Sequence, residues 1–150
     1  NMNDVEALTL GSHGETMVPV PSQCRVNGKL LTEILSKDEI DDLVQKTSNG
    51  GAEIVALLKT GSAYFAPSSA ASTMVKSIIS DANDVMPACS WLEGEYGISD
   101  VYLGVPTKLG KNGVTEVVEL ELNSDELTDL KNASNAVKDK VKELNSIISQ

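Results

Sequence analysis

The sequence predicts an α+β fold in which an antiparallel sheet packs with long helices. Three observations predict it: short apolar runs separated by turn residues open the chain, helical periodicity occupies long stretches, and a glycine-bounded hairpin pattern lies between them. The elements follow in the order β, α, β, α, with no internal repeat, low-complexity segment or linker. We therefore expect the 150 residues to form one domain.

The N-terminal part has the pattern of short strands. Residues 5–10 and 16–20 are partly apolar runs on either side of residues 11–15, which predicts a strand, a tight turn and a second strand. Residues 24–26 predict a third short strand. The Asn-Gly pair that follows predicts a turn, because both residue types tolerate positive φ.

Helical periodicity begins near residue 36. Ser36 and Glu39 have the spacing of a capping box, and apolar residues then recur on one face. The pattern continues over residues 52–59, beyond an Asn-Gly-Gly sequence at 49–51 that we expect to kink or break the helix. Residues 67–79 predict another helix, closely packed on a neighbour and with its proline in the first turn.

The second half of the chain predicts strands and then a helix. Residues 84–92, 101–109 and 114–122 have β patterns, and the Gly-Lys-Asn-Gly sequence at 110–113 is typical of a hairpin turn. We expect Ser124 to cap a long amphipathic helix. Its apolar stripe comprises Leu127, Leu130, Ala133, Val137, Val141, Leu144 and Ile148.

Composition narrows the class of protein. The 22 acidic and 12 basic residues give a formal charge of −10, which disfavours nucleic acid and anionic lipid as partners. Cys24 and Cys89 have neither CxxC spacing nor a neighbouring histidine, so we expect buried free thiols and no metal site. Without an 18-residue apolar run or a signal peptide pattern, the sequence predicts a cytoplasmic protein. Asn1 suggests a processed or excised end.

His13, the only histidine, lies in a Gly-Ser-His-Gly turn rather than on a helix face. An imidazole exchanges protons near neutral pH, and loop tips on rigid strands often carry catalytic groups. Flanking glycines leave it sterically open to a ligand. The alternative is a solvated histidine with no chemical role. By these patterns alone both interpretations stand.

Other catalytic motifs are missing or weak. The sequence contains no GxGxxG, GxxxxGK[ST] or GxSxG, and its neighbouring carboxylates are typical of solvated faces. Ser12 adjoins His13 on a strand end, which disfavours a nucleophile pair because neighbours point to opposite faces. Residues 61–67 combine small residues with two aromatic ones, which suits either tight helix packing around an aromatic core anchor or a pocket wall.

Four stretches together resemble the C-terminal half of the lactate/malate dehydrogenase family, in order and over essentially the whole chain. They are LTLGSHGETMVPVP, NGGAEIVALLKTGSAYFAP, CSWLEGEYGISDVYLGVPTKLGKNGV and the closing amphipathic helix. Within the family, the resemblance is closest to the malate dehydrogenases of lactate-dehydrogenase-like type.

The resemblance implies an oxidoreductase of the tricarboxylic acid cycle that interconverts malate and oxaloacetate with NAD. His13 matches the family's proton-transfer histidine, which takes the hydroxyl proton of a 2-hydroxy acid as hydride leaves its C2 atom. Gly14, Ser62 and Ala63 match positions on the substrate side of the pocket, and Pro67 matches a position near the nicotinamide ring. The family also implies a homodimer or homotetramer.

The sequence departs from the family in what it lacks. The N-terminal dinucleotide-binding half is absent, as is the Leu-Asp-x-x-x-Arg segment that orients the histidine and clamps the substrate carboxylate. Arg25, the only arginine, lies in a different context and takes no such role. We therefore expect residues 1–150 to be a C-terminal catalytic domain that is inactive alone.

Two alternatives stay open beside malate chemistry. The substrate could be lactate or another 2-hydroxy acid, because the segment that discriminates between them lies in the missing half. If the chain is complete as given, it could instead be a non-catalytic assembly domain. The sequence does not decide between NAD and NADP, or between dimer and tetramer.

Overall fold

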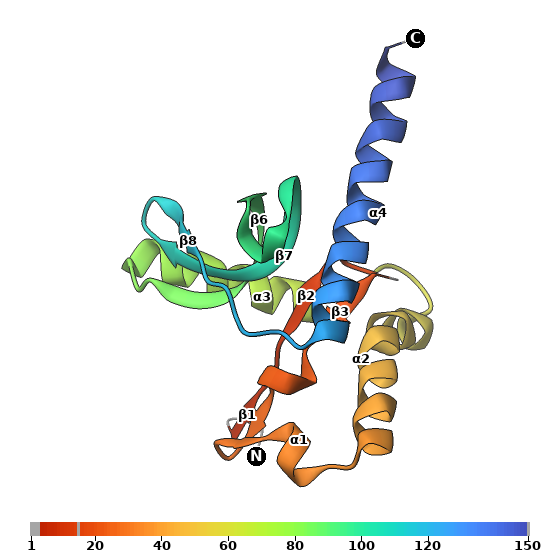
Figure 1. Cartoon of the computed structure of the whole chain (residues 1–150), viewed down its shortest axis with the longest axis vertical. Coiled ribbons are helices and arrows are strands. Elements are labelled where there is room, and N and C mark those ends of the chain that lie inside the picture. The colour runs from red at the N-terminus through yellow and green to blue at the C-terminus, as the bar shows by residue number, and fades with distance from the viewer. Residues whose placement is uncertain (1–3, 15, 150) are drawn as a thin grey trace.

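The computed structural model describes residues 4–14 and 16–149. In these residues two antiparallel sheets lie beside three long helices, which confirms the predicted α+β class (Figure 1). The elements are β1 (Val5–Glu6), β2 (Thr9–Gly11), β3 (Met17–Pro19), β4 (Arg25–Val26), β5 (Lys29–Leu30), α1 (Leu31–Ile34), α2 (Lys37–Leu58), α3 (Phe65–Ser80), β6 (Asp84–Glu93), β7 (Ser99–Gly110), β8 (Gly113–Val117) and α4 (Ser124–Ile148).

The larger sheet carries the candidate site. Its strand order is β3-β2-β7-β6, with β8 also paired to β7, and all of these pairs are antiparallel. Gly110 pairs with Gly113 across the predicted hairpin turn. In the smaller sheet, of order β1-β4-β5, Asn27 and Gly28 form the predicted turn with φ of 51° and 76°. Both turn predictions are confirmed.

Helix α2 confirms one local prediction and contradicts another. The Ser36 hydroxyl accepts the Glu39 N–H, and the Glu39 carboxylate accepts the Ser36 N–H, so the capping box forms. The expected break at Gly50 and Gly51 is wrong, because the helix continues through both glycines. A Cβ at either would meet no atom within 4 Å, so no close neighbour forces a break there. Glycine only weakens a helix that its cap and length sustain.

The cap of α4 lies one residue before the predicted Ser124. The Asn123 side chain accepts hydrogen bonds from the N–H groups of Asp125 and Glu126. The buried Glu126 carboxylate in turn accepts hydrogen bonds from the Ser22 N–H at 3.0 Å and the Ser22 hydroxyl at 2.6 Å. The same carboxylate accepts the Asn123 N–H at 3.0 Å, so Asn123 and Glu126 form a capping box, and the bonds to Ser22 tie it to the turn after β3.

Strand β8 is shorter than predicted because a tyrosine holds the segment that follows. The strand ends at Val117, whereas the pattern extended to residue 122. The buried Tyr96 hydroxyl donates to the Val118 carbonyl at 3.1 Å and accepts the Leu120 N–H at 3.0 Å. The Tyr96 N–H donates to the Glu119 carboxylate at 2.5 Å. The segment therefore bonds to the turn at Tyr96 instead of continuing along the sheet.

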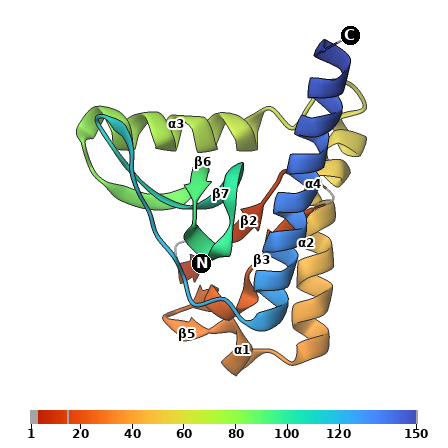
Figure 2. The same ribbon diagram turned by 45° about the horizontal axis from the view of Figure 1, so that its top comes forward.

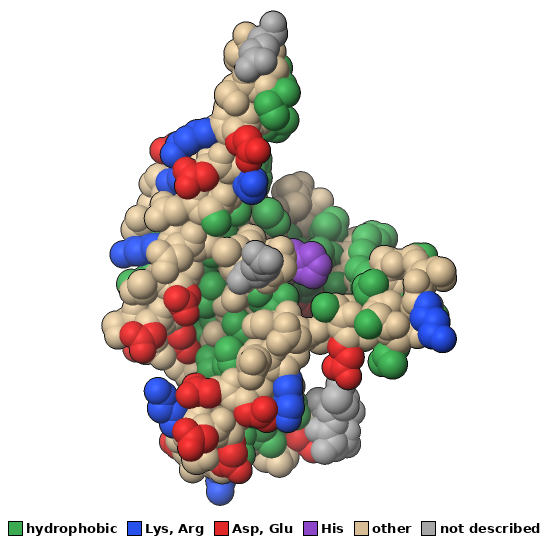
Figure 3. Space-filling model, turned by 90° about the vertical axis from the view of Figure 1, so that its right-hand side faces the viewer, with side chains coloured by type: hydrophobic (Ala, Val, Ile, Leu, Met, Phe, Trp, Pro, Cys, Tyr) green, Lys and Arg blue, Asp and Glu red, His purple; other side chains and the backbone are tan. Residues whose placement is uncertain are grey.

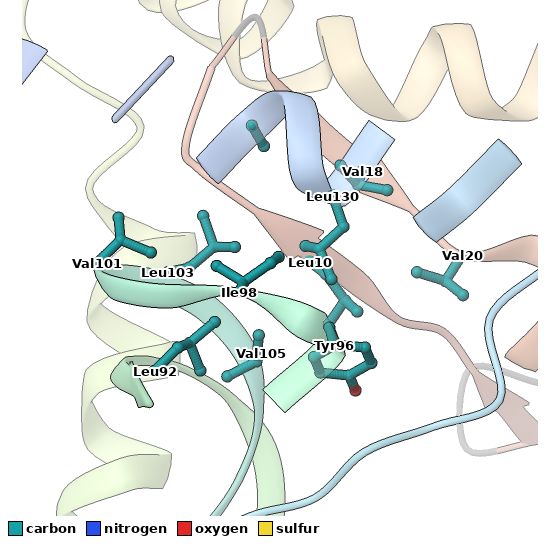
Figure 4. Packing of buried hydrophobic residues seen from close by; sticks show 11 residues of the cluster. Leu10, Val18, Val20, Leu92, Tyr96, Ile98, Val101, Leu103, Val105 and Leu130 are labelled. Carbon is teal, nitrogen blue, oxygen red and sulfur yellow. The ribbon is translucent and has the colours of Figure 1, made fainter. Parts of the chain in front are cut away.

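The core lies between the larger sheet and α4. Figure 4 shows its side chains converging from β2, β3, β6, β7 and α4. Its buried members are Leu10, Val18, Val20, Leu92, Tyr96, Ile98, Val101, Leu103, Val105, Leu130 and Ala133. Four of the seven residues predicted for the stripe of α4, Leu127, Leu130, Ala133 and Val137, pack in or against this core.

The remaining three residues of that stripe are exposed to solvent. Val141, Leu144 and Ile148 are at least half exposed, on the part of α4 that projects beyond the sheets (Figure 1).

Helix α3 runs crosswise to α4 (Figure 2), and its buried Ser77 donates to the Leu109 carbonyl of β7 at 3.0 Å. Within the described residues, no helix is long and apolar enough to cross a membrane.

Tyr96 gives the stability of the chain a pH dependence. Burial raises the pKa of its hydroxyl above the ordinary value of 10.0, and the nearby Glu119 charge acts in the same direction, against the Leu120 hydrogen bond. The contribution is complete below pH 10 and is lost as the pH rises through the folded-state pKa. Urea unfolding from pH 8 to 11 should show a smaller alkaline decline in Tyr96→Phe than in the parent. At pH 8 that variant should be less stable by about 1–3 kcal/mol.

Tyr102→Phe provides the matched control, because that ring is 60% exposed. It should keep the parent's alkaline decline. An equal decline in Tyr96→Phe and the parent would contradict the assignment.

Candidate active site

His13 lies just past the end of β2, at the tip of the β2–β3 hairpin, which confirms the predicted location. The strands pair from Thr9 to Gly11, and beyond them the Met17 N–H donates to the Gly14 carbonyl at 3.1 Å. The imidazole is exposed. Gly14 has φ of 109°, and a Cβ there would meet no atom within 4 Å. The turn therefore presents the histidine with open space beside it.

A groove of about 570 Å³ opens beside His13. Figure 3 shows the histidine at a hollow in the surface with apolar side chains around it. The groove is lined from four directions: the hairpin, the β6–β7 ribbon, α3 and α4. Lining side chains include His13, Met17, Met74, Cys89, Tyr102 and Val137. Segments far apart in sequence thus converge on the imidazole.

The groove is apolar. None of the described residues that line it is an aspartate, glutamate, lysine or arginine. The described part of the chain also gives the His13 side chain no hydrogen bond or ion pair, and shows no cluster of His, Cys, Asp and Glu suited to a metal. Among the described residues, the groove therefore offers one proton-transfer group and an apolar wall, and no carboxylate or cation lines it.

Residues 61–67 do not form the aromatic core anchor that was one of two interpretations. Tyr64 is 54% exposed and Phe65 is 83% exposed. That interpretation is wrong because the Tyr64 ring folds back over Gly61, which has no Cβ to clash with it. The described residues that line the His13 groove do not include Ser62, Ala63 or Pro67. Ser62 and Pro67 are exposed and Ala63 is half-buried.

The prediction that both cysteines are buried is wrong, since Cys89 is exposed and Cys24 is only half-buried. Cys24 is half-buried, and its thiol donates to the Val20 carbonyl at 3.2 Å. Cys89 is exposed, because β6 turns Ala88, Ser90 and Leu92 inward and leaves the alternate residues on the open face. That face forms part of the groove. Composition could not reveal which face of the strand is covered.

Several lining residues escaped the sequence analysis. Met17 and Met74 carry no chemical pattern, and Val137 was predicted only as part of the apolar stripe of α4. Gly104 did carry a signal, because a glycine inside a strand often marks the close approach of another backbone. It pairs with Gly11 at the base of the hairpin.

Comparison with known proteins places this arrangement in a family. The model of the lactate/malate dehydrogenase alpha/beta C-terminal domain matches residues 1–148. The chain belongs to the lactate/malate dehydrogenase family. A malate dehydrogenase of Rhodopirellula baltica is 43% identical over 150 residues, which are 100% of this chain and 48% of that protein. The chain thus spans about half the length of the curated relatives it matches.

Solved structures of the family have the same fold. Malate dehydrogenase from Salinibacter ruber has a TM-score of 0.95 and 38% identity, over 99% of this chain and 48% of that one. Lactate dehydrogenase from Eimeria maxima, solved with NADH and oxamate, has a TM-score of 0.93 and 30% identity, over 99% of this chain and 48% of that one. The likeness extends to both kinds of dehydrogenase in the family.

The open face of β6 predicts unequal reactivity of the two thiols. Iodoacetamide should alkylate Cys89 at least several times faster than Cys24 in the 150-residue chain, because only Cys24 is half-buried and hydrogen-bonded. Peptide mass spectrometry over a time course measures both rates. In Cys89→Ser the fast phase should vanish, while Cys24→Ser should keep it. Equal rates, or a faster Cys24, would contradict the assigned strand face.

Proposed function

We propose that residues 1–150 are the C-terminal catalytic half of an NAD-dependent malate dehydrogenase. An N-terminal dinucleotide-binding half completes it. The observation that carries the proposal is His13, exposed between glycines above an apolar groove, in a chain that matches the family's C-terminal domain. The relatives named malate dehydrogenase support malate as the substrate.

In this proposal His13 is the general base for malate oxidation and the general acid for oxaloacetate reduction. The imidazole accepts the substrate's hydroxyl proton as hydride leaves C2, and returns a proton to the 2-oxo oxygen in the reverse direction. NAD supplies the hydride acceptor when bound. The open space at Gly14 and the exposed imidazole suit an approach of substrate from the groove side.

The remaining site residues complete the proposal within this chain. The family resemblance supports Ser62 and Ala63, with Gly14, as substrate-side residues of the complete enzyme, where small side chains leave room for the second carboxylate of malate. Pro67, in the first turn of α3, borders the nicotinamide. An apolar wall beside the imidazole fits a flat, uncharged ring, whereas the chain has no glycine-rich loop for the dinucleotide phosphates.

The groups that bind charge must come from the other half. No cationic side chain lines the groove among the described residues, and Arg25 donates to the Gly28 carbonyl at 3.2 Å within its own hairpin. A substrate dicarboxylate needs a cationic partner, and a histidine that gains a proton is stabilised by a carboxylate. The 150 residues alone should therefore turn over little substrate.

Exposed apolar surface supports assembly. Phe65 and Ile79 of α3 and Leu57 of α2 are 74–83% exposed, and exposed apolar surface of this kind can form subunit contacts. We include a homodimer or homotetramer in the proposal, with helical faces as the contacts. The two unpaired cysteines suit a reducing compartment, so the proposal places the enzyme in the cytoplasm.

A substitution at His13 tests the catalytic role. In the intact enzyme, His13→Asn should lower kcat about 10²- to 10⁴-fold, because the amide cannot exchange a proton at neutral pH. NADH affinity, measured by fluorescence titration, should stay within about twofold. Asn135→Ala on α4 is a surface control that should keep wild-type turnover. Near-normal kcat in His13→Asn would refute the proposed role.

Lactate dehydrogenase is the second candidate, favoured by the likeness to the Eimeria maxima enzyme. Steady-state rates with oxaloacetate and with pyruvate separate the two. We expect kcat/KM for oxaloacetate to exceed that for pyruvate by at least about 10²-fold, since a missing carboxylate leaves a charged partner unpaired. The reverse preference would identify lactate or another 2-hydroxy acid as the substrate. Turnover of neither would favour a non-catalytic assembly domain.

A further inference from the structure

The turn that carries His13 is held against the ribbon by a close contact between two glycines. Gly11 of β2 pairs with Gly104 of β7, and it is the one register pair between these strands in the described residues. A Cβ on Gly104 would lie 2.6 Å from the Gly11 carbonyl oxygen. Because that neighbour is backbone, no side-chain rotation relieves the overlap. A methyl group at Gly104 must push β2 away from β7.

The displacement would pass directly to the candidate site. Gly11 is two residues before His13 and is itself confined, since a Cβ on it would lie 2.8 Å from the Thr16 carbonyl oxygen and 3.0 Å from a Val18 methyl group. The hairpin around it cannot absorb a shift by collapsing inward. Moving β2 therefore moves the turn as a unit relative to the groove.

Two hydrogen bonds between Ser12 and Thr16 close the turn across its base. The Ser12 and Thr16 hydroxyl groups share a hydrogen bond, and the Ser12 N–H donates to the Thr16 carbonyl at 3.4 Å. Both residues are half-buried, whereas His13 between them is exposed. In the described part of the chain the imidazole has no hydrogen bond of its own. Its orientation relative to the groove thus depends on the residues that fix the turn.

We propose that Gly104 and Thr16 are positioning residues for His13, a role that rests on the proposed function. Gly104 sets the depth at which the turn sits over the groove, because its missing side chain lets β2 approach. Thr16 sets the direction of the imidazole by tying its hydroxyl to Ser12. Neither residue needs to touch the substrate. Each acts through the backbone of the turn.

The test uses four variants of the intact enzyme. Gly104→Ala should lower kcat about 100-fold, the usual scale for a misplacement of about 1 Å in a catalytic group. Thr16→Val removes the hydroxyl at constant shape and should lower kcat about tenfold, while Thr16→Ser should restore it. Gly51→Ala is the matched control, since its added methyl group meets no atom within 4 Å. KM for NADH should change less than about twofold in all four.

A second readout follows the imidazole without turnover. In protein labelled with ¹⁵N-histidine, the His13 signal is assigned by its absence in His13→Asn. It should shift in Gly104→Ala and Thr16→Val, and stay in place in Thr16→Ser and Gly51→Ala. If Gly104→Ala fails to fold, the Thr16 pair decides alone.

The outcomes separate this inference from the proposed function. An unmoved His13 signal and unchanged kcat in Gly104→Ala and Thr16→Val overturn the positioning roles, even if melting temperatures fall. Full turnover in His13→Asn overturns the proposed function instead. A moved signal with reduced kcat in both variants, rescued in Thr16→Ser, supports both.

Discussion

The close backbone contact between Gly11 and Gly104 is the constraint on which this arrangement depends. It joins a short N-terminal hairpin to the long β6–β7 ribbon through two residues that are 93 positions apart in sequence. Helix α4 packs over the same junction, where the Ala133 methyl group would lie 3.4 Å from a Cβ on Gly11. Leu10 and Leu103, next to the two glycines, are almost completely buried in the shared core. The contact between Gly11 and Gly104 therefore affects both the packing of the core and the position of His13.

The face of the β6–β7 ribbon that points away from α4 is apolar and exposed. On the face away from α4, the ribbon exposes Pro87, Cys89 and the edge-to-face pair Trp91 and Tyr102, whose ring centres lie 5.1 Å apart. Covering this surface would be favourable by roughly 25 cal/mol for each Å² of apolar area buried. The neighbouring groove offers one imidazole and no charged side chain in the described residues. Under the proposed function, the other half of the enzyme supplies the charges.

How much the sequence could predict depended on how local each feature is. The Ser36 capping box, the Asn27-Gly28 turn, the Gly110–Gly113 hairpin and the turn at His13 are each specified by residues within a few positions of one another. These features can therefore be recognised from the sequence without knowing how distant segments pack. The family resemblance rests on the order of such local patterns, which is why it could be stated before the fold was seen.

The failures involve contacts between distant segments. Strand β8 ends early because Tyr96 binds the segment after it. The cap of α4 is an exception, since Asn123 and Glu126 have the local spacing of a capping box and form one. The exposure of Cys89 depends on which face of the sheet α4 covers. No pattern of single residues encodes these pairings. The lining of the groove by Met74 is of the same kind, since it requires the crossing of α3 to be known.

The central claim is that this domain works as one half of a longer enzyme. The most direct measurement is the mass of the native polypeptide that carries this sequence, isolated from its own cells and measured intact. The account predicts a mass about twice the 15.9 kDa of this chain, because the relatives are about twice as long. A native mass of 15.9 kDa would contradict it. His13 would then lie in a chain without a dinucleotide-binding half, and its groove would serve assembly rather than hydride transfer.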